Sequence, residues 1–214
     1  MTENPDTARV YRKPRRYGTG RMEALSDGVF AFAATLLVLD LVIPRSDGTQ
    51  DLLGAFFDLW PHYLTYVISF ATIGATWLAH NAICEQLKRA DSTFLRLNLV
   101  LLLLVAFVPF PTRFLAEYIS SDASERVAVV LYGVSFLLLL GMTLLLWWYA
   151  RTHSLLADDE EGESRLFTYR LLPGIGVYVI LICLGLVWPM AAVLGYLALA
   201  LFFIVPLRRR RQTA

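Results

Sequence analysis

Charged and hydroxyl side chains interrupt the first apolar run of the chain, which extends from residue 21 to residue 40. Arg21, Ser26, Asp27 and Asp40 all lie in this run, which is long enough to cross a bilayer. A charge that faces hydrocarbon is costly, so these groups must face protein or a path that contains water. Such side chains can interact with ions, exchange protons, or form hydrogen bonds that orient one helix against its neighbours. They are therefore candidate functional residues.

The spacing of this run places its side chains on opposite helix faces. At about 100° per residue, one face carries a small residue, a phenyl ring, a hydroxyl and branched aliphatic side chains: Gly28, Phe32, Thr35, Leu39 and Ile43. Ser26 and Asp27 lie on the other side. From spacing alone, helix packing explains the first face, because an apolar stripe at helical spacing usually belongs to a core.

The face that carries Ser26 and Asp27 predicts a buried hydrogen-bond cluster. Polar side chains that can donate to it lie in the second and third apolar runs: Trp77, His80, Asn81, Arg96 and Asn98. The first three of these share one helix face, because their spacing is i, i+3, i+4. Such a cluster would hold the first helix against the others, and protonation of His80 or Asp27 would also allow it to sense pH.

The composition is typical of a polytopic membrane protein: 57% of the 214 residues are hydrophobic and only 17% are charged. Six segments are long and apolar enough to span a bilayer: about 23–43, 59–80, 94–115, 127–150, 169–188 and 190–207. Pro109 and Pro111 predict a kink or an end in the third segment, and Trp188-Pro189 predicts a tight turn between the last two. The expected fold is all-α, with six transmembrane helices per chain.

Basic residues are distributed unevenly about these segments. With six spans, 16 of the 19 Lys and Arg residues fall on the side of the two termini. The excess predicts that both termini are cytoplasmic, in the plasma membrane. The expected domains are a basic cytoplasmic amino terminus at 1–20, a transmembrane domain at 21–207 and a basic cytoplasmic carboxyl terminus at 208–214.

The remaining reactive residues form no catalytic or metal-binding pattern. The two cysteines, Cys84 and Cys183, have neither metal-ligand nor redox spacing, and the three histidines are scattered. We therefore expect no enzyme activity, no cofactor and no nucleic-acid partner.

Several motifs resemble those of the transmembrane protein 175 family, which comprises potassium channels of endolysosomes and their bacterial relatives. The signature begins with Arg21-x-x-x-Leu25-Ser26-Asp27 and continues in an Ala/Phe/Thr/Leu run to Leu41. Similar motifs follow at Tyr66–Phe70, Trp77-x-x-His80, Arg96-Leu-Asn98 and Pro109-Phe-Pro-Thr112. Two residues depart from the family pattern, because Leu25 replaces the usual Phe and Asn81 replaces the second His of a frequent pair.

The resemblance implies a homotetramer in membrane lipid, with a pore that the first helix of each chain lines. The constriction position, usually Ile or Leu, falls on Phe32, and Thr35 and Leu39 align with the next levels. The chain has no Thr-Val-Gly-Tyr-Gly loop, so a narrow apolar constriction would select K⁺ over Na⁺ through the lower cost of dehydrating K⁺. No metal other than the permeating K⁺ is implied.

Alternatives of other kinds remain open. A secondary transporter usually contains paired broken helices, whereas Pro109–Pro111 is the single candidate break in this sequence. A proton-permeable channel and a non-conducting scaffold are also compatible with the residues.

Overall fold

The computed structural model describes residues 19–41, 52–121, 124–157 and 161–205. Within these ranges the chain is helical, and its one β-type contact is a bridge between Leu87 and Leu156. The helices are α1 (Gly20–Leu36), the 3₁₀ helix η1 (Leu37–Asp40), α2 (Leu52–Asp58), α3 (Trp60–Glu85), α4 (Ser92–Phe107), α5 (Pro109–Tyr118), α6 (Glu125–Thr152), α7 (Glu161–Gly185) and α8 (Pro189–Ile204). The predicted all-α fold is confirmed.

Long apolar helices account for the predicted membrane segments. In the described part of the chain, four helical stretches are long and apolar enough to cross a membrane: Gly20–Asp40, Leu53–Glu85, Ser92–Tyr118 and Glu125–Thr152. Two shorter apolar helices, Leu171–Gly185 and Pro189–Ile204, correspond to the fifth and sixth predicted segments. The chain is therefore a multi-pass membrane protein.

Some predicted boundaries are wrong. The first segment was expected to reach residue 43, but its α-helix ends at Leu36 and η1 ends at Asp40. Ile43 lies outside the described residues. The second helix continues to Glu85 rather than ending near residue 80, because hydropathy marks where apolar side chains stop and not where helical hydrogen bonding stops.

The prolines of the third segment divide it as expected. α4 ends at Phe107 and α5 begins at Pro109, because proline lacks the backbone donor that would continue the ladder. At its other end, Asp91 caps α4 by accepting bonds from the backbone N–H groups of Thr93 and Phe94. The short turn before Pro189 is also confirmed, with α7 ending at Gly185.

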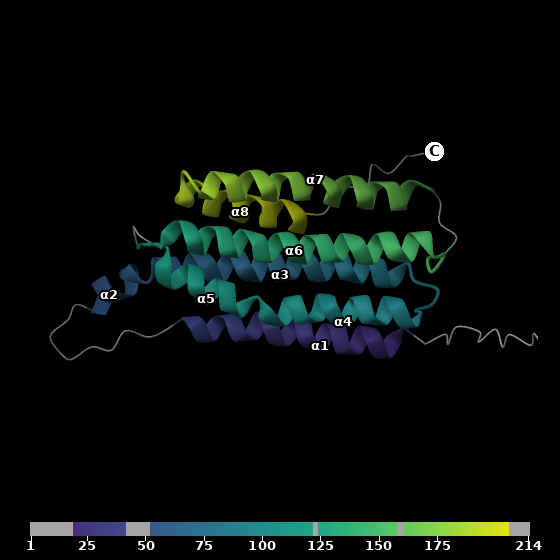
Figure 1. Cartoon of the computed structure of the whole chain (residues 1–214). Coiled ribbons are helices and arrows are strands. Elements are labelled where there is room, and N and C mark those ends of the chain that lie inside the picture. The colour runs from purple at the N-terminus through teal and green to yellow at the C-terminus, as the bar shows by residue number, and fades with distance from the viewer. Residues whose placement is uncertain (1–18, 42–51, 122–123, 158–160, 206–214) are drawn as a thin grey trace, which may run out of the picture.

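The helices form a bundle in which α1 lies at one outer edge and α7 at the other (Figure 1). α3 and α6 run between these edges, and α1 packs against α3 and α4. The amino-terminal ends of α1 and α4 and the carboxyl-terminal end of α3 lie at the same end of the bundle (Figure 1). The peripheral position of α1 leaves one of its faces uncovered by the rest of the chain.

Candidate functional site

The two faces of α1 differ sharply in burial. Phe32 is 65% exposed and Leu39 is 72% exposed, whereas Phe30 is 3% exposed and Leu37 is fully buried. Gly28 and Thr35 are exposed as well. The side chains that the spacing placed on one stripe thus lie on the uncovered face of the helix. We call Gly28, Phe32, Thr35 and Leu39 the α1 stripe.

The α1 stripe is almost entirely apolar. Its single hydroxyl, Thr35 Oγ1, donates to the backbone oxygen of Phe32 at 2.8 Å. That bond uses the proton and leaves acceptor capacity on the oxygen, as a cation ligand requires. The stripe therefore offers a ring of hydrocarbon at Phe32 and an oxygen one turn further along.

A buried hydrogen-bond chain fixes the opposite face of α1. Ser26 Oγ donates to the Met22 backbone oxygen at 2.9 Å and accepts from Asn98 Nδ2 at 3.0 Å. Asn98 Oδ1 lies 2.8 Å from His80 Nε2. Because an amide oxygen only accepts, His80 must donate from Nε2. Ser26, His80 and Asn98 are all at least 98% buried, so this chain ties α1 to α3 through α4.

Asp27 makes a separate contact at the edge of the same face. Its Oδ1 accepts a hydrogen bond from Trp77 Nε1 at 2.9 Å. Of the other predicted partners, Asn81 instead donates to Glu85 at 2.9 Å. Arg21 and Arg96 are exposed and form no hydrogen bond or ion pair with the residues that the structure describes. Five of the predicted motif residues thus form hydrogen bonds between helices, in two separate groups, whereas Arg21 and Asn81 lie apart from them.

A second hydroxyl cluster was not anticipated from the sequence. Ser69 Oγ lies 2.7 Å from Thr112 Oγ1 and 2.8 Å from the Tyr132 hydroxyl. These buried groups join α3, α5 and α6. Ser69 and Thr112 lie within the motifs quoted above, but Tyr132 in the apolar α6 carries no spacing signal that would identify it as their partner.

Grooves flank α1 on both sides. One has a volume of about 330 Å³ and lies between α1 and α3, where its lining includes Asp27, Phe70, Gly74 and Trp77. The other has a volume of about 470 Å³ and is lined by α1 residues, including Gly28 and Phe32, and by Ala106. The second groove includes part of the α1 stripe, and the first is lined by Ala31 and Ala34 of the same helix, so the uncovered surface extends beyond a single helix face.

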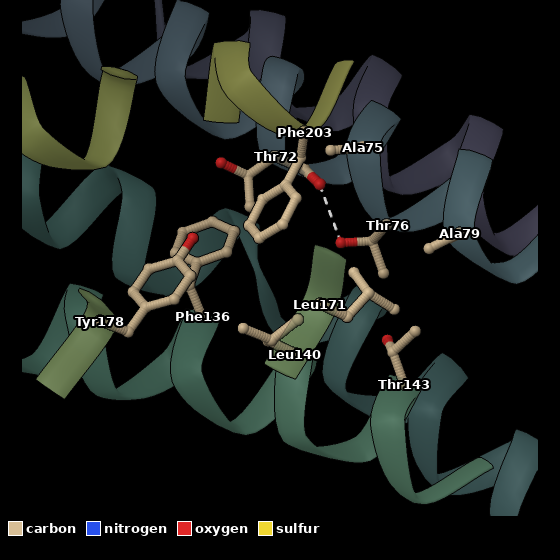
Figure 2. Close-up of a pocket in the computed structure, with 10 residues that line it drawn as sticks. All are labelled: Thr72, Ala75, Thr76, Ala79, Phe136, Leu140, Thr143, Leu171, Tyr178 and Phe203. Atoms are coloured by element: carbon tan, nitrogen blue, oxygen red, sulfur yellow. Dashed lines mark hydrogen bonds between the residues drawn. The ribbon is translucent and has the colours of Figure 1, made fainter. Parts of the chain in front are cut away.

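The interior of the subunit offers much less room. Figure 2 shows a cavity between α3, α6, α7 and α8 into which Thr72, Thr76 and Thr143 project. Its volume is about 30 Å³, which is enough for one or two water molecules. Thr72, Thr76 and Thr143 each donate to a backbone oxygen of their own helix. This space is too small for a hydrated cation, so it is not an ion path.

Comparison with known proteins identifies the family. Residues 21–109 match the family model described as endosomal/lysosomal potassium channel TMEM175. A potassium channel of Chamaesiphon minutus is 38% identical over 192 residues, which cover 87% of this chain and 94% of the relative. The chain belongs to the TMEM175 family. A potassium channel of Streptomyces collinus is 42% identical over 131 residues, and that match spans 61% of this chain and 64% of the relative's length.

A solved TMEM175 structure has the same fold. The crystal structure of a lysosomal potassium-selective channel TMEM175 homolog from Chamaesiphon minutus superposes with a TM-score of 0.80 at 37% identity. The match covers 86% of this chain and 95% of that one. The likeness therefore includes the last three helices, which the family model does not reach.

Proposed function

We propose that this protein is a K⁺-selective cation channel, in which the α1 stripes of a homotetramer line a central pore. One observation carries the proposal: the α1 stripe is exposed although buried hydrogen bonds hold the opposite face of α1 in place. A rigid helix with an uncovered apolar face is the element that a pore between subunits requires. The potassium channels among the relatives support the same function.

We place the conduit between copies of the chain. The cavity inside the subunit has no room for an ion with its water. The exposed stripe belongs to α1, which lies at an outer edge of the bundle (Figure 1). Identical subunits usually assemble with closed symmetry, and head-to-tail contacts between them close into rings. A tetramer brings each stripe to the shared axis, with Phe32 at the narrowest level.

Selectivity then follows from dehydration. At Phe32 an ion meets phenyl rings, which cannot replace its water, and a hydrophobic ring can also close by expelling water from the pore. Thr35 supplies an oxygen directly after this level. K⁺ holds its water less tightly than Na⁺, so the same constriction admits K⁺ more readily.

Orientation completes the proposal. We place the protein in the plasma membrane, with both termini in the cytoplasm. The distribution of 16 basic residues against 3 supports this arrangement. Arg113 and Arg126 belong to the minority and lie in α5 and at the start of α6. In Figure 1, α5 and the start of α6 are toward the end of the bundle opposite to the start of α1.

The test is a bi-ionic recording from purified protein in planar bilayers. With K⁺ on one side and Na⁺ on the other, we expect discrete single-channel currents and a reversal potential set by K⁺. The recording is repeated at two pH values, because a reversal potential that follows the proton gradient would show a proton-permeable channel. Coupled flux without unitary currents would identify a transporter and contradict the proposal.

A further inference from the structure

The two sides of α1 present different surfaces beside the α1 stripe. α1 packs on α3 along one side and on α4 along the other. In a closed ring of identical chains, one side of each copy meets the other side of the next copy. The α3 side and the α4 side must therefore fit each other. This step rests on the proposed function, which places the stripes at a common axis.

The α3 side is recessed. It contains the groove of about 330 Å³, whose lining includes Phe70, Gly74 and Trp77. Gly74 contributes to the depth of the groove, since a Cβ added there would meet no atom within 4 Å. Exposed acidic groups lie on the same side, at Asp27 and Glu85. We call this surface the α3 flank.

The α4 side contains the second groove, of about 470 Å³, beside α1, and a row of exposed apolar side chains along α4. Leu99, Leu103, Ala106 and Phe107 are exposed along α4 at spacings of three and four residues, and they form a ridge. Arg96 extends the ridge toward the end at which α4 begins, and it is exposed with no ion-pair partner among the described residues. We call this surface the α4 flank.

The heights of the two flanks match. His80 and Asn98 are hydrogen bonded, so they lie at one level of the bundle. Because α3 and α4 run in opposite directions, Gly74, six residues before His80, is level with Leu103, five residues after Asn98. Glu85 and Arg96 both lie on the other side of the His80–Asn98 bond, toward the end of the bundle at which α4 begins. Rotation about an axis parallel to the bundle preserves these levels.

We infer that the α4 flank of one copy docks into the α3 flank of the next, with Leu103 entering the groove at Gly74 and Arg96 facing Glu85. The ridge fills the recess, and the guanidinium gains a carboxylate partner that it lacks among the described residues of its own chain. Lipid in the groove would leave Arg96 without that partner. The interface is heterologous, so each copy uses both flanks and the ring closes around the α1 stripes.

Disulfide cross-linking in membranes tests this contact. Cys84 and Cys183 are first replaced by alanine, and Gly74→Cys and Leu103→Cys are then introduced together. After mild oxidation we expect a ladder of covalent oligomers, including the tetramer, on a non-reducing gel. Each single substitution should remain monomeric, because a heterologous contact does not bring identical residues together. The matched control pairs Gly74→Cys with Leu138→Cys, since Leu138 is an exposed residue of α6.

Charge reversal tests the polar part of the interface. Arg96→Glu and Glu85→Arg should each lower the fraction of tetramer in native mass spectra at least twofold, and the double variant should restore it. Independent, additive losses would overturn the Arg96–Glu85 pairing. Absence of a ladder in the Gly74/Leu103 pair, or a disulfide within one chain, would overturn the docking itself.

The cross-linking result and the proposed function can be tested separately. The ladder is read without any current, and K⁺ current is recorded from the same cysteine-free background. If the protein conducts K⁺ but gives no ladder, the proposed interface is contradicted and the channel function is not. If the protein gives the ladder but carries no current, the interface is supported and the channel function is contradicted.

Discussion

The phenyl ring of Phe32 is the largest side chain on the α1 stripe, so it sets the width of a conduit that this stripe lines. Its neighbours along the stripe are a glycine one turn before and a threonine one turn after. Hydrocarbon at this level repels ions that retain water, and the hydroxyl that follows offers partial compensation. The stripe thus combines its barrier and its single polar group within two helical turns.

Removing the ring should widen the barrier. We expect Phe32→Ala to raise single-channel K⁺ conductance by about twofold or more and to weaken discrimination against Na⁺, because less water must be removed. Bilayer recordings measure both quantities. Phe57→Ala is the control, since Phe57 is equally exposed but lies on α2. Unchanged currents in Phe32→Ala would exclude this ring as the constriction.

Removing the Thr35 hydroxyl should alter ion selectivity with little change in the volume of the side chain. Thr35→Val replaces the oxygen by a methyl group of similar volume, so an ion at that level loses a ligand. We expect the K⁺/Na⁺ reversal potential to shift, whereas Thr152→Val, at an exposed threonine near the end of α6, should leave it unaltered. If Thr35→Val has the same K⁺/Na⁺ reversal potential as the unsubstituted protein, the Thr35 hydroxyl does not coordinate the ion.

At the scale of the helix, α1 holds its orientation through bonds on the face away from the stripe. Ser26, Asn98 and His80 form an unbroken buried chain across three helices. Asp27 and Trp77 add a second, more exposed link. A helix fixed in this way presents the same side chains outward, which a constriction of fixed width requires.

Breaking the buried chain should cost stability. Asn98→Ala leaves Ser26 and His80 without their shared partner, and each unsatisfied buried group costs about 1–3 kcal/mol. We therefore expect the thermal unfolding midpoint of the detergent-solubilised protein to fall by several degrees. Asn81→Ala is the matched control, because its exposed bond to Glu85 contributes little. Equal losses in the two variants would contradict the structural role of the chain.

A double-mutant cycle tests the hydrogen bond between Trp77 and Asp27. Trp77→Phe removes the indole N–H that Asp27 accepts, so it should lower the unfolding midpoint in an otherwise unchanged protein. In the Asp27→Ala background the same change should have a much smaller effect. Additive losses would show that the two side chains act independently.

Periodicity and hydropathy predicted most of these helices, and the prolines predicted where α4 ends. The residues near the end of α1 escaped prediction, because apolar side chains continue past Asp40 although regular α-helix stops at Leu36. The hydrogen-bonded face that carries Ser26 and Asp27 was predicted from the cost of placing polar groups against lipid. Tyr132 could not be found in this way, since its partner Ser69 is 63 residues away and only the packed fold brings them together.

At the scale of the whole molecule, the proposed pore requires several copies of the chain. Each subunit folds around its own core of helices, yet its uncovered face and flanking grooves remain open. Assembly would cover the grooves and leave only the α1 stripe in contact with water and ions. The peripheral place of α1 in the single chain is what allows it to occupy the centre of the proposed assembly.

Cysteine accessibility along α1 tests the central claim most directly. In the background without Cys84 and Cys183, a water-soluble cationic thiol reagent is applied during K⁺ recording to Thr35→Cys, Leu39→Cys and Ala33→Cys. We predict rapid loss of current in Thr35→Cys and Leu39→Cys, and no effect in Ala33→Cys, whose position is buried. Undiminished current with both stripe positions fully labelled would contradict a pore lined by this face.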